Sequence, residues 1–311
     1  MDKIRKQFPV TAEECAKKNK KVVVMVGDIS HGIFSNFKKK FPKRYYNIGI
    51  LEPTMISFAA GIAKSGLIPV AHTIAPFIID RSFEQIKLDF CYHKLPGNIV
   101  SVGGTFDYSA LGCTHHTYSD IAVLKTLQNI EIFYPTSPIE FDVLFKKNFA
   151  NNKLSYFRIP KKDHSINFDI GDLKKTNLLK LSKGKDLTVV CCGPIVETCK
   201  LVVDKLSKKI KIDLIYLNKI YPLNMNPIIE SVKKNKKILI VQDHPQPGGL
   251  SDEILRNLIL TKNNNFLAEV IALPDRFIDI YGSYEELCDH VGLSENNITK
   301  KIYKLFNNKK F

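Results

Sequence analysis

Short runs of apolar residues, separated by segments with helical periodicity, most strongly constrain how this chain folds. The first run, Lys21 to Val26, reads KVVVMV. A run without polar alternation is typical of a strand buried on both faces, as in a parallel sheet. Similar runs predict strands at 45–50, 70–75, 98–102, 130–134 and 155–159, and helices are expected at 53–64, 82–92, 121–127 and 138–148. This alternation predicts an α/β domain with a mainly parallel sheet.

The same pattern restarts after a polar, charged stretch at 161–183. Strands are expected at 187–192, 212–217, 238–241 and 268–273, and helices at 194–206, 226–233 and 248–260. We therefore predict two three-layer α/β domains, residues 1–165 and residues 184–311, joined by a linker at 166–183. Two domains also suit a chain of 311 residues, because domains usually contain about 100–200 residues.

The net charge of +15 is the feature that could indicate nucleic-acid binding. The lysines are spread in small groups over both halves, which argues against it, although the charge can attract an anionic substrate or an acidic partner. No apolar run reaches the ~18 residues of a membrane span, and no signal-type segment follows the charged first residues. Seven scattered cysteines without zinc-ligand spacing predict buried free thiols. We expect a cytoplasmic protein that binds neither nucleic acid nor membrane.

An acidic residue stands where an expected strand runs into an expected helix. In NIGILEPTMISFAAGIAKSG, Glu52 precedes Pro53, which suits the first turn of a helix, and Gly66 closes that helix. Open α/β sheets place functional groups at such junctions, and the helix N-terminus stabilises a negative charge. From geometry alone, Glu52 is as readily a capping carboxylate as a functional acid.

Two adjacent histidines, His115 and His116, lie in the expected loop GCTHHTYSD. Metal ligation, acid–base chemistry and a plain surface role are the alternatives for them. Adjacent side chains on a regular element point apart, so a metal site that uses both is not expected.

Taken in order, five segments give a resemblance that none gives alone: Asp28-Ile29-Ser30-His31, NIGILEP, the stretch from Thr73 to Phe83, GCTHH, and Tyr156-Phe157-Arg158. Together with the later QDHPQPGGLSDEI, they resemble the transketolase family over nearly the whole chain. Full-length members carry a diphosphate-binding, a pyrimidine-binding and a C-terminal domain. This chain resembles the last two, as in the C-terminal subunits of split transketolases.

The resemblance implies thiamine diphosphate as the cofactor. Glu52 matches the family's catalytic glutamate, which hydrogen-bonds the N1′ nitrogen of the aminopyrimidine, and burial would favour the protonated form that this role needs. Phe77 and Ile78 fall where the family packs side chains on the pyrimidine ring, although plain core packing is an equal alternative for each. No Gly-Asp-Gly segment with a downstream Asn is present to hold magnesium and diphosphate, so the Mg²⁺ ligands are expected from a partner subunit.

The substrate side follows from the same resemblance. His115 matches a histidine that faces substrate oxygens. Arg158 matches a basic residue near the substrate phosphate, and Arg81 resembles a phosphate-facing arginine of the deoxyxylulose-phosphate synthases, with a solvated surface role as its alternative. A guanidinium recognises phosphate through two hydrogen bonds. Ser30 and His31, at the end of the first strand, are weaker substrate-side candidates.

Some positions depart from the family. Leu51 and Pro53 stand where many relatives have arginine and histidine, and Leu111 replaces an aspartate that usually contacts a sugar hydroxyl. The cofactor chemistry therefore transfers better than the substrate. We expect two-carbon ketol transfer between sugar phosphates by an α2β2 heterotetramer with an N-terminal, diphosphate-binding subunit. The alternatives are the β subunit of a 2-oxoacid dehydrogenase, a decarboxylating deoxyxylulose-phosphate-synthase-like enzyme, and a non-catalytic scaffold.

Overall fold

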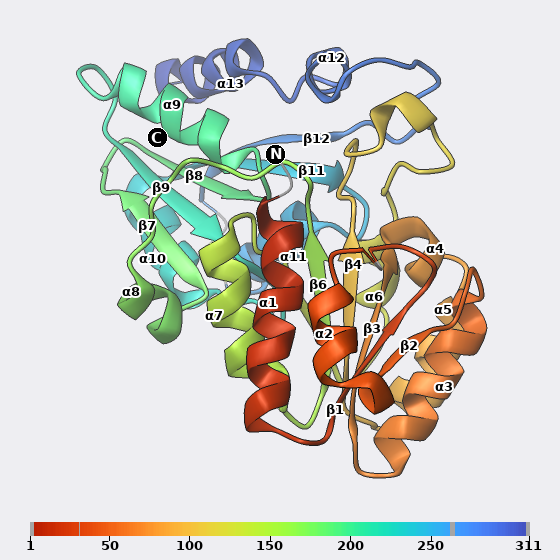
Figure 1. Ribbon diagram of the computed structural model, residues 1–311. Coiled ribbons are helices and arrows are strands. Elements are labelled where there is room, and N and C mark those ends of the chain that lie inside the picture. Colours follow the sequence, from red (N-terminus) through yellow and green to blue (C-terminus); the bar gives the residue numbers. More distant parts are fainter. Residues whose placement is uncertain (1–2, 31, 262–264, 309–311) are drawn as a thin grey trace.

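The computed structural model describes residues 3–30, 32–261 and 265–308, which form two α/β units (Figure 1). The first is built on a seven-stranded sheet of order β10-β5-β6-β4-β3-β1-β2. Its strands are β1 (Val22–Val26), β2 (Tyr45–Asn47), β3 (Ile68–Ile74), β4 (Gly97–Val102), β5 (Ile130–Phe133), β6 (Leu154–Ile159) and β10 (Lys219–Tyr221). All neighbours are parallel except β10 and β5. Strand β1 is buried at every position, as its unbroken apolar sequence predicts.

Helices cover both faces of this sheet. Two of them, α1 (Lys3–Lys18) and α7 (Pro138–Asn148), pack side by side on one face around Phe8, Phe141 and Phe145. The other helical segments of this half are α2 (Ser35–Lys40), η1 (Pro42–Arg44), α3 (Glu52–Lys64), α4 (Ala75–Ile79), α5 (Phe83–Gln85), the π-helical η2 (Ile86–Tyr92), η3 (Ser109–Leu111) and α6 (Asp120–Leu124).

The second unit has a five-stranded sheet of order β12-β11-β8-β9-β7, in which only β7 is antiparallel to its neighbour. Its strands are β7 (Leu178–Ser182), β8 (Leu187–Cys192), β9 (Ile212–Leu217), β11 (Lys237–Pro245) and β12 (Leu267–Leu273). The helices after residue 165 are α8 (Ile170–Lys175), α9 (Val196–Leu206), α10 (Asn226–Asn235), α11 (Leu250–Leu260), α12 (Tyr284–His290) and α13 (Glu295–Asn307). No helix in the described part of the chain combines the length and apolarity of a membrane span.

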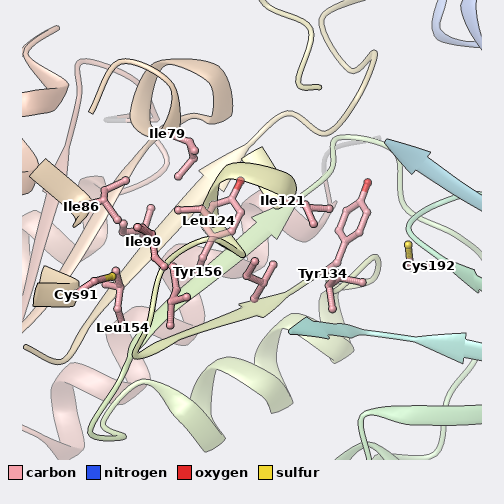
Figure 2. Close-up of a cluster of buried hydrophobic side chains, with 14 of the residues drawn as sticks. Ile79, Ile86, Cys91, Ile99, Ile121, Leu124, Tyr134, Leu154, Tyr156 and Cys192 are labelled. Carbon is pink, nitrogen blue, oxygen red and sulfur yellow. The ribbon is translucent and has the colours of Figure 1, made fainter. Parts of the chain in front are cut away.

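The two units share an apolar core. Its largest cluster contains Ile121 and Tyr156 from the first unit and Cys192 and Leu250 from the second. Figure 2 shows part of it, ending at Tyr134 and Cys192 near the boundary between the units. Since burial of apolar area stabilises by roughly 25 cal/mol per Å², a core common to both units holds them in one arrangement.

The stretch expected as a linker, 166–183, is more structured than the sequence indicates. It contains helix α8 and strand β7, whose Leu178 and Leu179 are buried. Its polar, charged composition reflects an edge strand and a surface helix, which carry little periodic apolar signal. Strand β10 follows β9 in the sequence but belongs to the first sheet, where Lys219 pairs with Phe133.

Candidate active site

The acid predicted to be functional, Glu52, is the first residue of helix α3. Strand β2 ends at Asn47, and Gly49 takes a left-handed conformation (φ +81°) that turns the chain before the helix. Pro53 follows at a position where its missing N–H costs nothing. Although Glu52 is only 1% exposed, the two preceding residues, Ile50 and Leu51, are largely exposed. Glu52 is therefore a buried carboxylate under an open surface, as a residue that meets a ligand requires.

Arg81 lies directly against this carboxylate. Its Nη1 is 2.6 Å from Glu52 Oε2, and the Arg81 guanidinium stacks over the Phe77 ring, 4.7 Å from its centroid. The Arg81 side chain is 45% exposed, so water screens the pair. Glu52 is buried, as its predicted role requires, but the sequence did not predict this cation.

Aromatic contacts continue from Arg81 to His115. The Phe77 and His115 rings meet edge to face at 5.0 Å, and His115 Nδ1 is 2.9 Å from Thr114 Oγ1. Partial burial lowers the pKa of His115 below its usual value, which leaves a neutral imidazole at neutral pH. A neutral ring offers one donor and one acceptor, which suits contact with hydroxyl or carbonyl oxygens. Glu52, Arg81, Phe77 and His115 thus form one continuous line.

Arg158, which was predicted to contact the substrate phosphate, is instead buried between two aspartates. Its side chain is fully buried, with Nε 2.9 Å from Asp120 Oδ2 and Nη1 3.5 Å from Asp243 Oδ1. Asp120 begins α6 in the first unit, whereas Asp243 belongs to β11 in the second. The guanidinium joins the two units and presents no surface to a substrate, because strand β6 is central and buried at every position. The predicted phosphate role does not fit this position.

Ile78 fits the alternative of plain core packing. Its side chain is fully buried in the core, so among the two residues expected against the pyrimidine only Phe77 has surface to offer. Ser30 is buried as well: it accepts hydrogen bonds from Arg5 Nε and Nη2, and its hydroxyl lies 2.9 Å from His72 Nε2. His31 lies outside the described residues.

Two residues that the sequence did not single out extend the line beyond His115. The Tyr108 ring lies 6.0 Å from the His115 ring, and Lys161 Nζ lies 4.6 Å from the centre of Tyr108. The segment from Gly103 to Tyr108 has no regular periodicity, so pattern analysis carries no signal for it. Lys161 gives the line a second cation at the end opposite Arg81.

Comparison with known families and proteins identifies the family of the two units. Residues 3–165 match the family model described as transketolase, pyrimidine binding domain, and residues 176–298 match transketolase, C-terminal domain. The chain belongs to the transketolase family. The two matches also account for the two mainly parallel α/β units.

Several relatives have the same extent as this chain. It is 28% identical over 302 residues to a subunit of apulose-4-phosphate transketolase from Phocaeicola vulgatus, covering 95% of each chain. It is 28% identical to a putative transketolase C-terminal section of Methanocaldococcus jannaschii, covering 96% of this chain and 95% of the relative. It is 30% identical to 1-deoxy-D-xylulose-5-phosphate synthase of Alkaliphilus oremlandii, but spans only 48% of that protein. A solved structure titled "Split gene transketolase, inactive beta4 tetramer" has the same fold, with a TM-score of 0.88, 23% identity and 99% coverage of both chains.

Membership of this family implies thiamine diphosphate, and the residues fit one end of it. The Glu52 carboxylate at an open face and the partly exposed Phe77 ring suit a planar, nitrogen-containing ring. Among the described residues, the grouping with metal-ligand spacing is Cys192, Asp243 and His244. It is fully buried beside Arg158 and offers sulfur and imidazole, whereas Mg²⁺ takes oxygen ligands. Among the described residues, Glu52 and Phe77 thus suit an aminopyrimidine ring, and the one grouping with metal-ligand spacing does not suit Mg²⁺.

Proposed function

We propose that this chain is the C-terminal subunit of a split transketolase, which moves a two-carbon ketol unit between sugar phosphates when joined to a diphosphate-binding subunit. The observation that carries the proposal is the half-site itself: Glu52, Phe77 and His115 line up at an open face, and the one metal-ligand grouping among the described residues does not suit Mg²⁺. Relatives of equal length that are named as transketolase subunits or sections support it.

When bound, thiamine diphosphate supplies a nucleophilic carbon that takes up the ketol unit. Glu52 would hold a proton toward the pyrimidine ring. Arg81 Nη1 lies 2.6 Å from Glu52 Oε2, so the ring would reach this oxygen only after Arg81 withdraws from it. Its guanidinium remains stacked on Phe77 and is then free to meet the phosphate of a substrate.

His115 supplies the substrate side. With its pKa lowered by burial, the ring stays neutral and can donate to, or accept from, a substrate hydroxyl. Its contacts with Phe77 and Tyr108 restrict its rotation. Because correct orientation of a reacting group contributes several kcal/mol to catalysis, a held imidazole serves a sugar substrate better than a free one.

The partner would cover the exposed apolar surface beside Glu52. Ile50 is 66% exposed, Leu51 is 55% exposed and Phe58 is 44% exposed, all on α3 or immediately before it. Apolar side chains clustered around a buried functional acid are typical of an interface. A diphosphate-binding subunit docked here brings magnesium ligands to the cofactor that Glu52 contacts. The net charge of +15 favours an acidic partner, and a heterotetramer of two copies of each chain is the expected assembly.

The proposal is tested by mixing this chain with the candidate diphosphate-binding subunit, thiamine diphosphate and Mg²⁺. A ketose phosphate donor and an aldose acceptor should give ketol transfer only when both chains are present. Transfer by this chain alone, or no transfer by the mixture with any phosphorylated ketose, would contradict the proposal.

A second candidate is decarboxylation of a 2-oxoacid, as in deoxyxylulose-phosphate synthase. The relative of that name at 30% identity and the apolar Leu111 beside Gly112 favour it. Pyruvate in place of the ketose donor distinguishes the two, because only the decarboxylating enzyme releases carbon dioxide.

A further inference from the structure

An irregular segment of the C-terminal domain reaches across to the loop that carries His115. Residues 274–283 connect β12 to α12 without regular structure of their own. In Figure 1 this blue segment passes close to the yellow loop that precedes α6, at the upper right. Ile278, in the middle of the segment, is buried in the C-terminal core, whereas Phe277 and Tyr281 are each 73% exposed. The segment is anchored to its own domain and presents two aromatic rings outward.

Tyr281 contacts the beginning of the loop. Gly112 has φ +71°, and a Cβ built on it would lie only 2.6 Å from Tyr281 Cε1. The ring therefore packs directly against the Gly112 backbone, where no other residue would leave space. The carbonyl oxygen of the same Gly112 accepts a hydrogen bond of 3.0 Å from the His115 backbone N–H. Only Gly112 separates the Tyr281 ring from the His115 backbone.

The end of the loop is held by the same segment. The backbone N–H of Ile278 donates to Tyr118 Oη at 3.3 Å, and the Phe277 and Tyr118 rings meet at 6.1 Å. Tyr118 Oη is in turn 2.7 Å from His116 Nδ1, and His116 is buried against Phe106. Residues 112 and 118 are thus both fixed from the C-terminal domain, with His115 between them.

We propose that Tyr281 is a positioning residue that holds His115 toward the substrate through Gly112. The effect on catalysis rests on the proposed function, whereas the effect of Tyr281 on the position of the loop does not. His115 is held from one side by Phe77 and Tyr108 of its own domain. The Tyr281 contact holds the loop separately, through the Gly112 backbone, and so restrains the loop from moving away from Phe77. The C-terminal domain would then contribute to the active site without touching the reacting atoms.

The test compares Tyr281→Ala with Tyr281→Phe. The nearest atoms to Gly112 are the ring carbons Cε1 and Cζ, with the hydroxyl oxygen slightly farther away, so Phe keeps the ring contact and Ala removes it. Amide hydrogen exchange is measured by mass spectrometry over residues 112–119, and the titration of His115 is followed by NMR. In Tyr281→Ala, exchange in this loop should accelerate, and the His115 titration should move up toward its ordinary midpoint as the ring becomes more exposed. Tyr281→Phe should match the unmodified chain in both.

Kinetics on the reconstituted complex complete the test. Tyr281→Ala should lower kcat by up to about 100-fold, with cofactor affinity unchanged. Exchange in strands β8 and β9 serves as the folding control. The second variant is Phe277→Leu, which alters the other end of the brace, that is, of the contacts of Phe277, Ile278 and Tyr281 with the loop 112–118. Unchanged loop exchange and titration in Tyr281→Ala, or equal damage in Tyr281→Phe, would overturn the proposal. A complex that transfers no ketol unit with any variant contradicts the proposed function alone, since exchange and NMR still test the brace.

Discussion

Replacing Arg158 with methionine distinguishes a structural guanidinium from a phosphate ligand. Arg158 faces Asp120 and Asp243, and all three side chains are at most 1% exposed. Asp243 Oδ2 also accepts hydrogen bonds from Tyr134 Oη at 2.6 Å and Thr105 Oγ1 at 2.8 Å. Arg158→Met therefore leaves two buried carboxylates without their cation at the junction of the two domains.

The magnitude follows from that burial. Removing one partner of a buried ion pair costs about 3–5 kcal/mol, because the remaining charge keeps its desolvation penalty. This is a large part of the roughly 5–15 kcal/mol that holds a protein folded. With a urea dependence of about 2–3 kcal/mol per M, the unfolding midpoint should fall by about 1–2.5 M.

The assay is urea unfolding of Arg158→Met beside Arg158→Lys. Lysine keeps the charge, but a single ammonium group cannot replace the planar fork between the two aspartates, so an intermediate loss is expected. A reconstituted Arg158→Lys complex that stays folded should bind a phosphorylated donor with nearly unchanged KM. A loss of stability below about 1 kcal/mol, together with a large rise in KM for phosphorylated substrates, would refute the reasoning.

Three further predictions follow from the site. Glu52→Gln should lower kcat about 10²–10⁴-fold without weakening the fold. Glu230→Gln, on the exposed face of α10, should leave kcat unchanged. If both variants keep the kcat of the unmodified chain, Glu52 is only a capping residue. Arg81→Gln frees Glu52 Oε2, so cofactor affinity measured by calorimetry should hold while KM for a phosphorylated donor rises about tenfold; weaker cofactor binding would contradict the displacement of Arg81. Burial opposes ionisation of Asp243, but Arg158, with His244 and Tyr134, outweighs it and lowers the pKa of Asp243 from 3.8 to about 2. Its contribution is thus complete above about pH 4 and lost as the pH falls toward 2, about 2 kcal/mol in all; urea unfolding from pH 6 to 2 should show a shallower loss in Asp243→Asn.

Much of the fold could be predicted because its strands are buried on both faces. The largely apolar runs at Val22–Val26, Leu187–Cys192 and Ile212–Leu217 show no helical periodicity, and every residue in them is buried. Strand β10 could not be predicted, because three residues carry no period and its partner β5 lies far away in sequence. Helix α1 was missed because its apolar positions are diluted by lysines and interrupted by Pro9.

The site residues likewise differ in how far the sequence could predict them. Glu52 and His115 could be selected as candidates because one lies at a strand–helix junction and the other in a loop, and the resemblance to the family then suggested their roles. Arg158 and Ile78 resemble site residues along the chain, yet their burial depends on packing across the sheet and between the domains, which no local pattern encodes. The brace formed by Tyr281 pairs residues that are far apart in sequence, so only the folded chain brings it together.

The central claim is that this chain supplies only the pyrimidine half of a divided site. Calorimetry of thiamine diphosphate with Mg²⁺, on this chain alone and then with the diphosphate-binding subunit, tests it most directly. The account predicts tight binding in the mixture only, and loss of that binding when Phe77 is replaced by alanine. Tight binding by the isolated chain would contradict it, since the chain would then hold the magnesium diphosphate itself.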